Sequence, residues 1–442
     1  MLRRIGEEPS LKETKKPMKE VSFPAPFKEG LEFSSPARGT WNIVHTGMLI
    51  PQSHQIFVCA QGCLRGVVLT AAEMNAMGRY SSVAIREENV LEGNMEEFMI
   101  DGITDVLKKL SYKPKAVLVF ISCQHFFLAY DQDMVFRELR KRFPDISFTD
   151  CYMIPTLRKS GLTPDQKMRI QLYSLLSPKE KRKDKINLIG SNLPISKSCE
   201  LFRIVKAAGA NLQMINWCKT YEEYLDMAQA SLNLYYEPLA KMAAEDLKQR
   251  LGQEAFYLPF VYQEDRIENA YEKLSQKLGI QKPDFKEEKA SAKKALKEAY
   301  QVIGNTPIAV DYTFTFRILS FVRMLLEHGF FVREIFADMF LPEEKEDFLW
   351  IKEHYPEMVI SPTSRPQMRF LVEKSEEKVL AIGQKAAYFT GTDYFVNVVE
   401  SGGLYGFDGI FQIANQMKEA FCHKKDRKIL IQRKGYGCES CI

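Results

Sequence analysis

Cysteines that directly follow apolar segments are the residues of this chain best suited to metal chemistry. Cys59 and Cys63 follow the apolar stretch 55–58, and Cys123 follows the stretch 115–122 (KAVLVFIS). Thiolate sulfur is the usual ligand of iron in iron–sulfur clusters, because a soft, negatively charged donor suits iron. Cysteine is also among the residue types most often buried in cores. Spacing alone therefore allows either ligation or packing for these three thiols.

A further pair of thiols stands near residue 442. Cys438 and Cys441 form a CxxC sequence, in which two intervening residues let both sulfurs reach one ion. Because this is only half of a usual four-cysteine site, a metal or redox role and a tail without a structural role both stay open. The remaining cysteines are predicted to be packing residues: Cys151, Cys199, Cys218 and Cys422.

Two histidines stand near the candidate ligands in the sequence. They are His54, before Cys59, and His125, after Cys123. Each could donate a hydrogen bond to a sulfide or thiolate and so shift the reduction potential of a bound cluster. Each could equally be satisfied by neighbouring backbone groups.

Alternating strands and helices position these residues. The predicted strands are 55–59, 115–122, 146–151, 185–190, 212–217, 307–310, 357–360, 379–382 and 394–398. The predicted helices are 95–110, 133–143, 198–208, 239–251, 267–278, 281–297, 314–328 and 409–421. Such βαβ alternation is typical of α/β folds with parallel sheets covered by helices. Ligands of these sheets bind beyond the carboxyl ends of the strands, which is where Cys59 and Cys123 fall.

The chain is too long for one core, and the alternation restarts twice. At 442 residues it exceeds the roughly 250–300 residues at which single cores stop growing. We predict an N-terminal arm at 1–39 that wraps over a neighbour and a cluster-binding α/β domain at 40–184. A second α/β domain is predicted at 185–300, and a third at 301–442 that includes the CxxC tail.

Composition narrows the class of protein. The chain is 45% hydrophobic and 27% charged, as ordinary globular proteins are. The net charge of +4 gives no argument for binding to nucleic acid or membranes. Because neither an N-terminal apolar segment nor a run of about 18 apolar residues occurs, we expect a cytoplasmic protein. In that compartment its nine cysteines are thiols or metal ligands in preference to disulfides.

Four segments resemble a known family. SHQIFVC at 53–59 resembles the S-H-G-P-V-G-C stretch of nitrogenase component 1 α-type subunits, and FISCQHFFLAYDQD at 120–133 resembles another of their cluster-binding segments. SLNL at 231–234 is similar to a part of their second domain, and LYGFDG at 404–409 is similar to their P-Y-H-G-F-D-G segment. The resemblance covers most of the chain from about Trp41. It implies three Rossmann-like domains, and ligation of an iron–sulfur cluster by Cys59 and Cys123.

Departures from the family pattern change what the resemblance implies. The family's first cluster cysteine would fall at 33–35, where none occurs, whereas Cys63 is an additional thiol. The implied cluster is therefore a [4Fe-4S] or P-cluster-like cluster at Cys59, Cys63 and Cys123, with Cys438 and Cys441 as a further candidate metal pair. The family's two anchors for the iron–molybdenum cofactor would fall at 236–237 and 396–397, where neither Cys nor His occurs. Dinitrogen reduction on that cofactor is not expected.

The resemblance also implies partners. We expect an oxidoreductase subunit of the nitrogenase component 1 type that pairs with a second such subunit, identical or homologous, and reduces a substrate that the sequence does not identify. Electrons are expected from an iron-protein-like reductase that hydrolyses the ATP, because this chain has no G-x-x-x-x-G-K-[ST] phosphate loop. Two alternatives stay open. One is a scaffold or carrier in metallocofactor assembly, and the other is a binding module that kept the fold and lost its metal.

Overall fold

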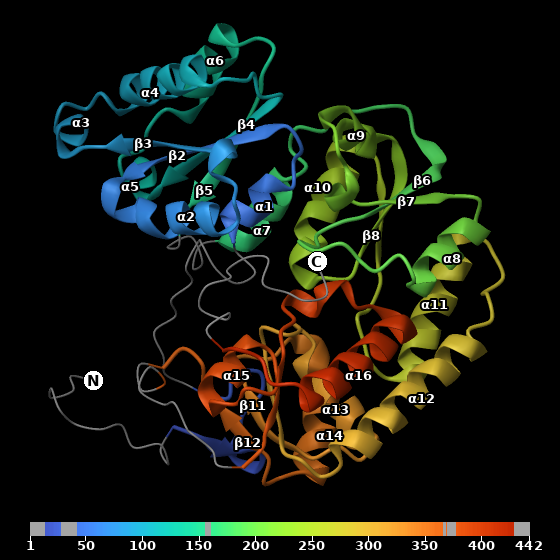
Figure 1. Ribbon diagram of the computed structural model, residues 1–442. Helices are drawn as coiled ribbons and strands as arrows, with labels where there is room; N and C mark the ends of the chain where they lie inside the picture. Colours follow the sequence, from blue (N-terminus) through green and yellow to red (C-terminus); the bar gives the residue numbers. More distant parts are fainter. Residues whose placement is uncertain (1–13, 28–41, 155–160, 366–367, 369–376, 428–442) are drawn as a thin grey trace, which may run out of the picture. The chain divides into compact units, whose positions relative to one another are not determined.

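The computed structural model describes residues 14–27, 42–154, 161–365, 368 and 377–427 (Figure 1). Contacts divide the chain into two compact units. Unit 1 comprises Met1–Phe33, Ile195–Ala207 and Pro259–Ile442, and unit 2 comprises Ser34–Pro194 and Ala208–Leu258. The domain boundaries expected from the sequence stay predictions.

The first sheet of unit 2 carries the candidate cysteines. Its strands are β2 (Ser53–Ala60), β3 (Tyr80–Ile85), β4 (Ala116–Ser122) and β5 (Ser147–Met153). They are all parallel and stand in the order β3-β2-β4-β5. The helices of this part are α1 (Ile43–Met48), α2 (Gln61–Glu73), α3 (Glu87–Leu91), α4 (Met95–Lys109), α5 (Cys123–Phe127), α6 (Gln132–Arg142) and α7 (Pro164–Gln171).

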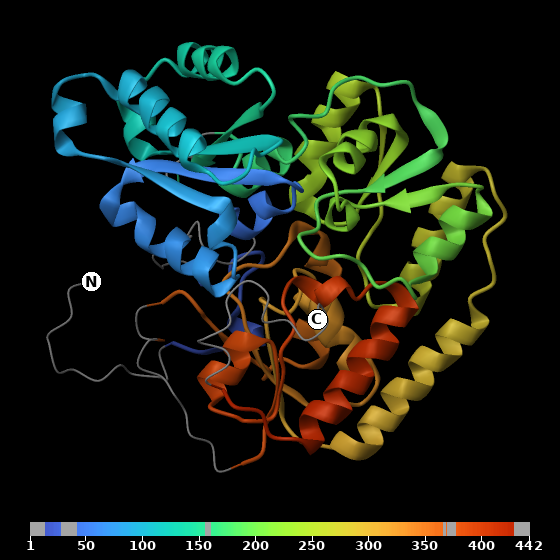
Figure 2. The same cartoon turned by 45° about the horizontal axis from the view of Figure 1, so that its top comes forward.

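Both faces of this sheet are buried, which explains the continuous apolar run of β4. Ile56 and Val58 of β2 belong to one hydrophobic cluster with residues of α4 and α6. Phe57 and Cys59 belong to another cluster with residues of α1 and α2. Figure 2 shows α4 and α6 on one side of the sheet and α2 on the other. Successive β2 side chains therefore alternate between the two faces, as the pleat of a strand requires.

The second sheet of unit 2 is also parallel. It has the order β7-β6-β8-β9 and consists of β6 (Arg182–Leu188), β7 (Asn211–Gln213), β8 (Ala230–Tyr235) and β9 (Glu254–Tyr257). Helices α9 (Tyr221–Asp226) and α10 (Lys241–Leu251) accompany it. Ala243 and Leu247 of α10 join the cluster that contains Phe57, so one apolar core serves both sheets of unit 2.

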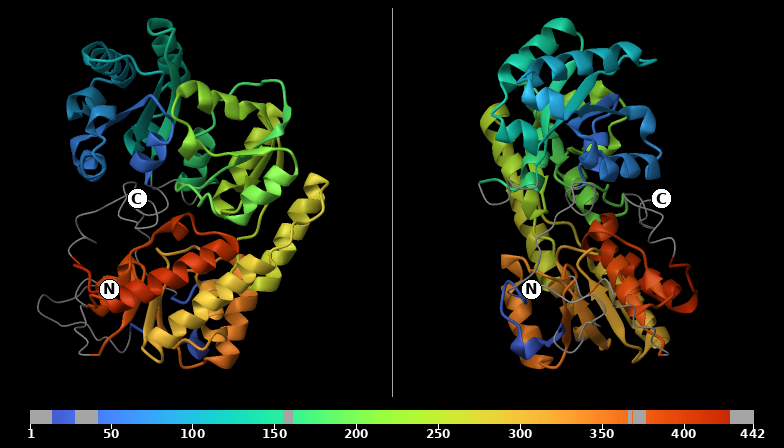
Figure 3. Two further views of the ribbon diagram at one scale, coloured as in Figure 1. Left: turned by 45° about the vertical axis from the view of Figure 1, so that its right-hand side comes forward. Right: turned by 90° about the vertical axis from the view of Figure 1, so that its left-hand side faces the viewer.

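Unit 1 contains a six-stranded sheet in the order β1-β12-β11-β10-β13-β14. Its strands are β1 (Lys16–Pro17), β10 (Ile308–Asp311), β11 (Val332–Phe336), β12 (Val359–Ser361), β13 (Leu380–Ile382) and β14 (Phe395–Val396). Its helices are α8 (Glu200–Ala207), α11 (Glu264–Leu278), α12 (Lys286–Ile303), α13 (Ile318–Glu327), α14 (Lys345–His354), α15 (Gln384–Thr390) and α16 (Gly406–Cys422). The long helices α12 and α16 run side by side (Figure 3).

Part of the expected N-terminal arm belongs to this sheet. Strand β1 pairs antiparallel with β12, and Met18 after it is fully buried. Residues 14–27 therefore pack on the chain itself, where the sequence suggested an arm over a neighbour. In the part of the chain that the structure describes, no helix is long and apolar enough to cross a membrane.

Candidate functional site

The carboxyl ends of β2 and β4 meet at one edge of the first sheet. Val58 of β2 lies opposite Ile121 of β4, so both strands end at the same level. The backbone N–H of Ala60 donates to Oε1 of Gln124 over 3.2 Å and ties the start of α2 to the start of α5. We call residues 59–64 and 122–128 the thiol edge, because Cys59, Cys63 and Cys123 all belong to it.

Cys59 is a core residue in this structure. It has no exposed surface, and it packs in the cluster that also contains Phe57, Leu64 and Phe120. Burial raises the pKa of its thiol to about 12, and the neighbouring Cys63 contributes in the same direction. A thiol in such surroundings stays protonated at neutral pH, because an apolar environment disfavours the thiolate.

The other two thiols of the edge reach the surface. Cys63 lies in the first turn of α2 and is exposed, whereas Cys123 is the first residue of α5 and is half-buried. Cys123 packs against the cluster on the α4 and α6 face, and Cys59 packs on the opposite face. The fold thus brings three thiols to one edge without directing them all to one point.

No complete metal site is formed by the residues that the structure describes, since no group of three or more His, Cys, Asp and Glu side chains is placed to hold an ion there. Cys438 and Cys441 lie outside the described residues. The three thiols of the thiol edge could bind a metal cluster only together with further donors.

His125 is held by the backbone that carries Cys123. Its Nδ1 accepts from the backbone N–H of Ser122 over 3.2 Å, which leaves the ring proton on Nε2. This Nε2 atom is buried without a hydrogen-bond partner among the described residues. Burial lowers the pKa of His125 to about 4, so the ring is neutral at pH 7 and offers one unused N–H donor.

His54 is satisfied far from the thiols. Its ring nitrogens pair with Tyr112 Oη at 2.7 Å and with Ser81 Oγ at 2.8 Å. It lies near the start of β2, about 16 Å along the strand from Cys59 at roughly 3.3 Å per residue. Two side chains therefore hold this ring, where the sequence suggested either a sulfur atom or neighbouring backbone groups.

The remaining cysteines are divided between core and surface. Cys151 and Cys199 are buried, as predicted, and Cys218 is half-buried. Burial raises the pKa of the Cys151 and Cys199 thiols well above the ordinary value. Cys422 is exposed at the end of α16, so its predicted packing role is wrong. A residue in the last turn of a helix faces either solvent or core, depending on its position around the helix axis. One cysteine in a sequence does not reveal that position.

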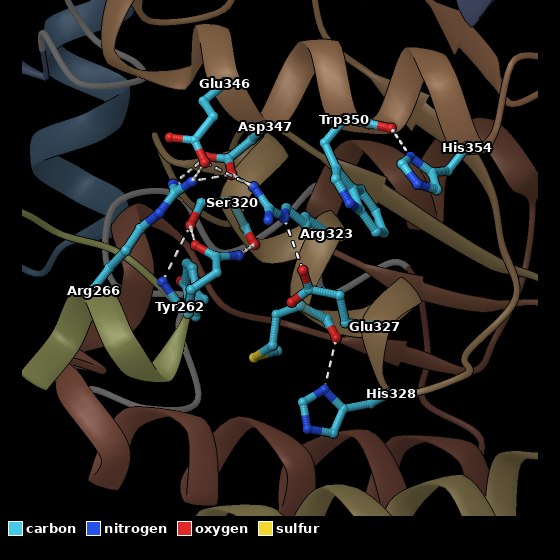
Figure 4. Close-up of polar contacts among 12 residues, drawn as sticks. Tyr262, Arg266, Ser320, Arg323, Glu327, His328, Glu346, Asp347, Trp350 and His354 are labelled. Atoms are coloured by element: carbon cyan, nitrogen blue, oxygen red, sulfur yellow. Dashed lines mark hydrogen bonds and ion pairs between the residues drawn. The ribbon is translucent and has the colours of Figure 1, made fainter.

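A cluster of charged side chains lines a pocket of about 350 Å³ in unit 1. Arg266 of α11 and Arg323 of α13 both donate to Asp347 of α14, with N···O distances of 3.1 Å (Figure 4). The carboxylate of Glu346 contacts the same two guanidinium groups from the solvent side. The sequence offered no signal for this network, because its members come from three helices far apart in the chain.

The pocket is a poor candidate for a catalytic centre. Three cations of this region form ion pairs with carboxylates of neighbouring helices: Arg266, Arg323 and Lys289. His328, also in the lining, bonds through Nδ1 to the carbonyl of Met324 at 2.9 Å. These pairs tie helices α11, α12, α13 and α14 together.

Three sheets of mainly parallel strands with helices between them define an α/β protein. The comparisons narrow this class. The sequence profile described as "Nitrogenase component 1 type Oxidoreductase" matches residues 44–422, which is most of the chain. The chain belongs to the nitrogenase component 1 type oxidoreductase family.

Solved structures agree on the fold. The chain is similar to "Nitrogenase Cp1 at pH 6.5" with a TM-score of 0.65 and 13% sequence identity, over 90% of this chain and 94% of that one. It is similar to "Nitrogenase Cp1 at pH 5" with a TM-score of 0.57 and 14% identity, over 91% and 94% of the two chains. A comparison with curated proteins finds no match. The fold class expected from the sequence is confirmed.

Proposed function

We propose that this chain is a redox subunit that holds an iron–sulfur cluster at the thiol edge and passes electrons to a substrate not yet identified. The observation that carries the proposal is the presence of Cys59, Cys63 and Cys123 at one edge of the first sheet, at the tied ends of β2 and β4, in a member of this family. An iron–molybdenum cofactor is not part of this proposal. At the positions where the family would anchor it, Glu237 and Asn397 supply neither a thiol nor an imidazole.

The chain's own residues would bind and surround the cluster. Thiolates at the thiol edge would hold iron, and the unused Nε2–H of His125 offers a hydrogen bond to sulfur, which stabilises the reduced state. When bound, such a cluster supplies one-electron transfer. A second component 1-type subunit would supply the missing donors, and an ATP-hydrolysing reductase resembling the nitrogenase iron protein would supply the electrons.

Anaerobic purification with iron and sulfide analysis tests the proposal. We expect bound iron and acid-labile sulfide, a broad visible absorption, and an electron paramagnetic resonance signal that appears on reduction. The Cys151→Ala variant, which removes a buried thiol on the same sheet, should keep all three. A colourless wild-type protein, even after reconstitution with iron and sulfide under anaerobic conditions, would contradict the redox assignment and favour a binding module without metal.

One observation favours a scaffold as the second candidate function. Cys63 is exposed, and an accessible ligand eases transfer of a cluster to another protein by ligand exchange. Transfer of iron and sulfide from the reconstituted chain to a metal-free ferredoxin would support the scaffold. Consumption of a small molecule that depends on the reductase and ATP would support the enzyme.

A further inference from the structure

We propose that β3 pairs edge to edge with β3 of a second copy of this chain, antiparallel about a twofold axis, so that the two first sheets continue into each other. The paired surface lies within unit 2 and includes neither the thiol edge nor a bound metal. Pairing of this kind is independent of the proposed function.

Strand β3 (Tyr80–Ile85) is an open edge of the first sheet. It ends the order β3-β2-β4-β5 and pairs with β2 along its whole length without a register shift. Within the described residues, no loop or side chain hydrogen bonds to the backbone groups that point away from β2. Such unpaired N–H and C=O groups form a template to which a strand of another chain can add.

The other edge strands that the structure describes are short or covered. Strands β1, β7, β9 and β14 contain two to four residues each. Strand β5 is covered by α7, and Arg140 donates to the carbonyl oxygen of Phe148 in it over 3.5 Å. Strand β3 has six residues, YSSVAI, with neither a charge nor a proline. It therefore lacks the devices by which proteins keep open edges apart.

Small side chains on one face of β3 leave room for a neighbouring strand. Ser82 and Ala84 are exposed, and they point to the same face because successive residues of a strand alternate. On the other face Val83 is buried, and a Cβ on Gly102 of α4 would lie 2.6 Å from Val83 Cγ1. Helix α4 thus packs closely on the strand. The edge is formed before a partner arrives, which lowers the entropy cost of pairing.

Acidic residues follow the carboxyl end of β3, where α3 begins (Figure 1). Segment 86–92 contains three exposed carboxylates, Glu87, Glu88 and Glu92, against one cation, Arg86. None of the three carboxylates forms an ion pair in the part of the chain that the structure describes. Their charge is therefore available to cations of a partner.

Basic residues stand at the opposite end of the strand. Helix α4 ends with Lys108 and Lys109, and the chain just beyond it is fixed beside the start of β3, since Tyr112 Oη donates to the carbonyl oxygen of Gly78 over 3.0 Å. Lys108 has no ion pair among the described residues, and Lys109 pairs at the surface with Asp105.

This distribution of charge selects an antiparallel second copy. In an antiparallel pair about a twofold axis, the carboxyl end of one β3 lies beside the amino end of the other. The carboxylates after β3 in each copy then face the lysines of the other copy, at both ends of the interface. Such complementarity favours this pairing over one in which like charges meet.

The oligomeric state of the full chain tests the pairing. Sedimentation velocity over a series of concentrations should show particles of two chains after iron is removed with a chelator, which excludes pairing through a shared metal group. Raising the salt from about 0.05 M to about 0.5 M should shift the equilibrium toward single chains, because salt screens the facing charges.

Exchange of charges identifies the surface. Glu88→Lys and Lys108→Glu should each weaken association by about tenfold or more, because each places like charges together at both ends of the pair. The two substitutions combined in one chain restore opposite charges and should regain most of the affinity. Lys248→Glu, at an exposed lysine of α10, is the matched control and should leave association unchanged.

Hydrogen exchange followed by mass spectrometry measures the new backbone bonds. In the two-chain state, exchange of the outward amides of 80–85 should slow by about tenfold or more relative to dilute single chains. Ser82→Lys places a charge on the edge, so it should abolish both the pairing and this concentration-dependent protection. Thermal unfolding like that of single wild-type chains shows that the variant still folds.

Three results would overturn the pairing. The first is single chains at every concentration. The second is two-chain particles that resist both the charge reversals and Ser82→Lys, which would place the second copy on another surface. The third is protection of 80–85 that does not depend on concentration, which would assign the edge to another segment of the same chain. Iron and sulfide content decides the proposed function separately, so the two failures are distinguishable.

Discussion

Gly406 illustrates how one residue type can be required by its neighbours. It opens α16 with φ of +69°. Next to it, Tyr271 Oη donates to Glu200 Oε2 over 2.8 Å, and Glu200 Oε1 accepts the backbone N–H of Asp408 over 2.8 Å. A Cβ at position 406 would lie 2.0 Å from Tyr271 Oη and 2.4 Å from Glu200 Oε2. The glycine therefore allows the helix start to approach this buried bond.

Gly406→Ala should destabilise unit 1 by about 3 kcal/mol, because it adds a clash and a broken buried hydrogen bond to the strain of positive φ. Gly279→Ala is the matched control. Gly279 has the same φ of +69°, and nothing lies within 4 Å of its added Cβ, so that only about 1 kcal/mol is expected. Urea denaturation of both variants measures the difference. Equal losses would show that conformational strain alone decides the effect.

Glu344 is a buried carboxyl group whose proton is linked to stability. It accepts from the backbone N–H of Leu319 over 2.8 Å and from that of Leu341 over 3.2 Å. Burial raises its pKa to about 7, against the opposing influence of Arg317. Between its ordinary value of 4.5 and about 7, the folded state keeps a proton that the unfolded state has released. The contribution of this group to stability is therefore complete below the lower value and is lost as the pH rises through the folded pKa.

Glu344→Gln should remove this pH dependence. The wild type is expected to lose on the order of 3 kcal/mol of local stability between pH 4.5 and 8 through this group, whereas the variant should lose little over the same range. Hydrogen exchange of peptides from 318–354, corrected for the intrinsic rate at each pH, measures it. Glu343→Gln, at the exposed neighbour, should behave as the wild type. An unchanged slope in Glu344→Gln would assign the pH dependence to another group.

At the scale of elements, one carboxylate joins three helices of unit 1. Asp347 of α14 has no exposed side-chain surface, and its oxygens accept from Arg266 of α11 and Arg323 of α13 at 3.1 Å. The Arg323 guanidinium also lies over the ring of Trp350, 5.0 Å from its centroid. Glu346 contacts the same arginines, but its side chain is 72% exposed. The buried Asp347 carboxylate thus compensates the charge of two partly buried arginines. Water screens the exposed Glu346 carboxylate, which therefore contributes less.

Asp347→Asn should lower the stability of unit 1 by about 3 kcal/mol, because removing one partner of a buried pair leaves the other charges uncompensated. Glu346→Gln, one residue away, should lower it by less than about 1 kcal/mol, as an exposed ion pair contributes little. Thermal unfolding of the two variants at low and at 0.5 M salt tests the distinction. If both variants lost a similar amount of stability, and salt abolished both losses, the stabilisation would come from the exposed pairs of Glu346 and not from Asp347.

At this scale the most apolar strand was predictable, whereas some less apolar elements were not. The run KAVLVFIS predicted β4, which the structure confirms at Ala116–Ser122, because both faces of a central parallel strand require apolar residues. The edge strand β3 (Tyr80–Ile85) was not predicted, since its exposed positions carry Ser and Ala. Helix α2 (Gln61–Glu73) was missed too, because Gly62, Gly66 and two adjacent valines lower helix propensity.

The candidate site was predictable only as far as position along strands is predictable. Ligands of parallel sheets bind beyond the carboxyl ends of the strands, and the structure has Cys59 and Cys123 at the same edge, at the ends of β2 and β4, but on opposite faces of the sheet. The direction of each side chain could not be predicted from the sequence in the same way. A slip of one residue moves a side chain to the other face, and whether Cys59 faces the core depends on the phase of the whole strand and on the helices that cover it.

At the scale of the whole molecule, the two units should respond oppositely to acid. Three histidines of unit 2 are buried as neutral rings: His45, His54 and His125. Burial is the main cause that lowers the pKa of each to about 4. Below pH 6.5, the ordinary pKa of histidine, these three rings bind protons in the unfolded chain but stay neutral in the folded chain. The stability that these groups contribute is present above pH 6.5 and is lost as the pH falls toward 4.

Acidification from pH 7 to pH 5 should therefore loosen unit 2, while Glu344 opposes loosening of unit 1. Each buried histidine contributes up to about 1.4 kcal/mol per pH unit in this window, so protection of the β2, β4 and β5 amides should fall steeply. Hydrogen exchange followed by mass spectrometry, corrected for intrinsic rates, resolves the two units in one sample. His125→Asn keeps an acceptor for the Ser122 N–H and removes one titrating ring, so it should reduce the slope for unit 2 by about one third. Equal protection of unit 2 at both pH values would mean that these rings already bind protons in the folded chain, against the burial that keeps them neutral.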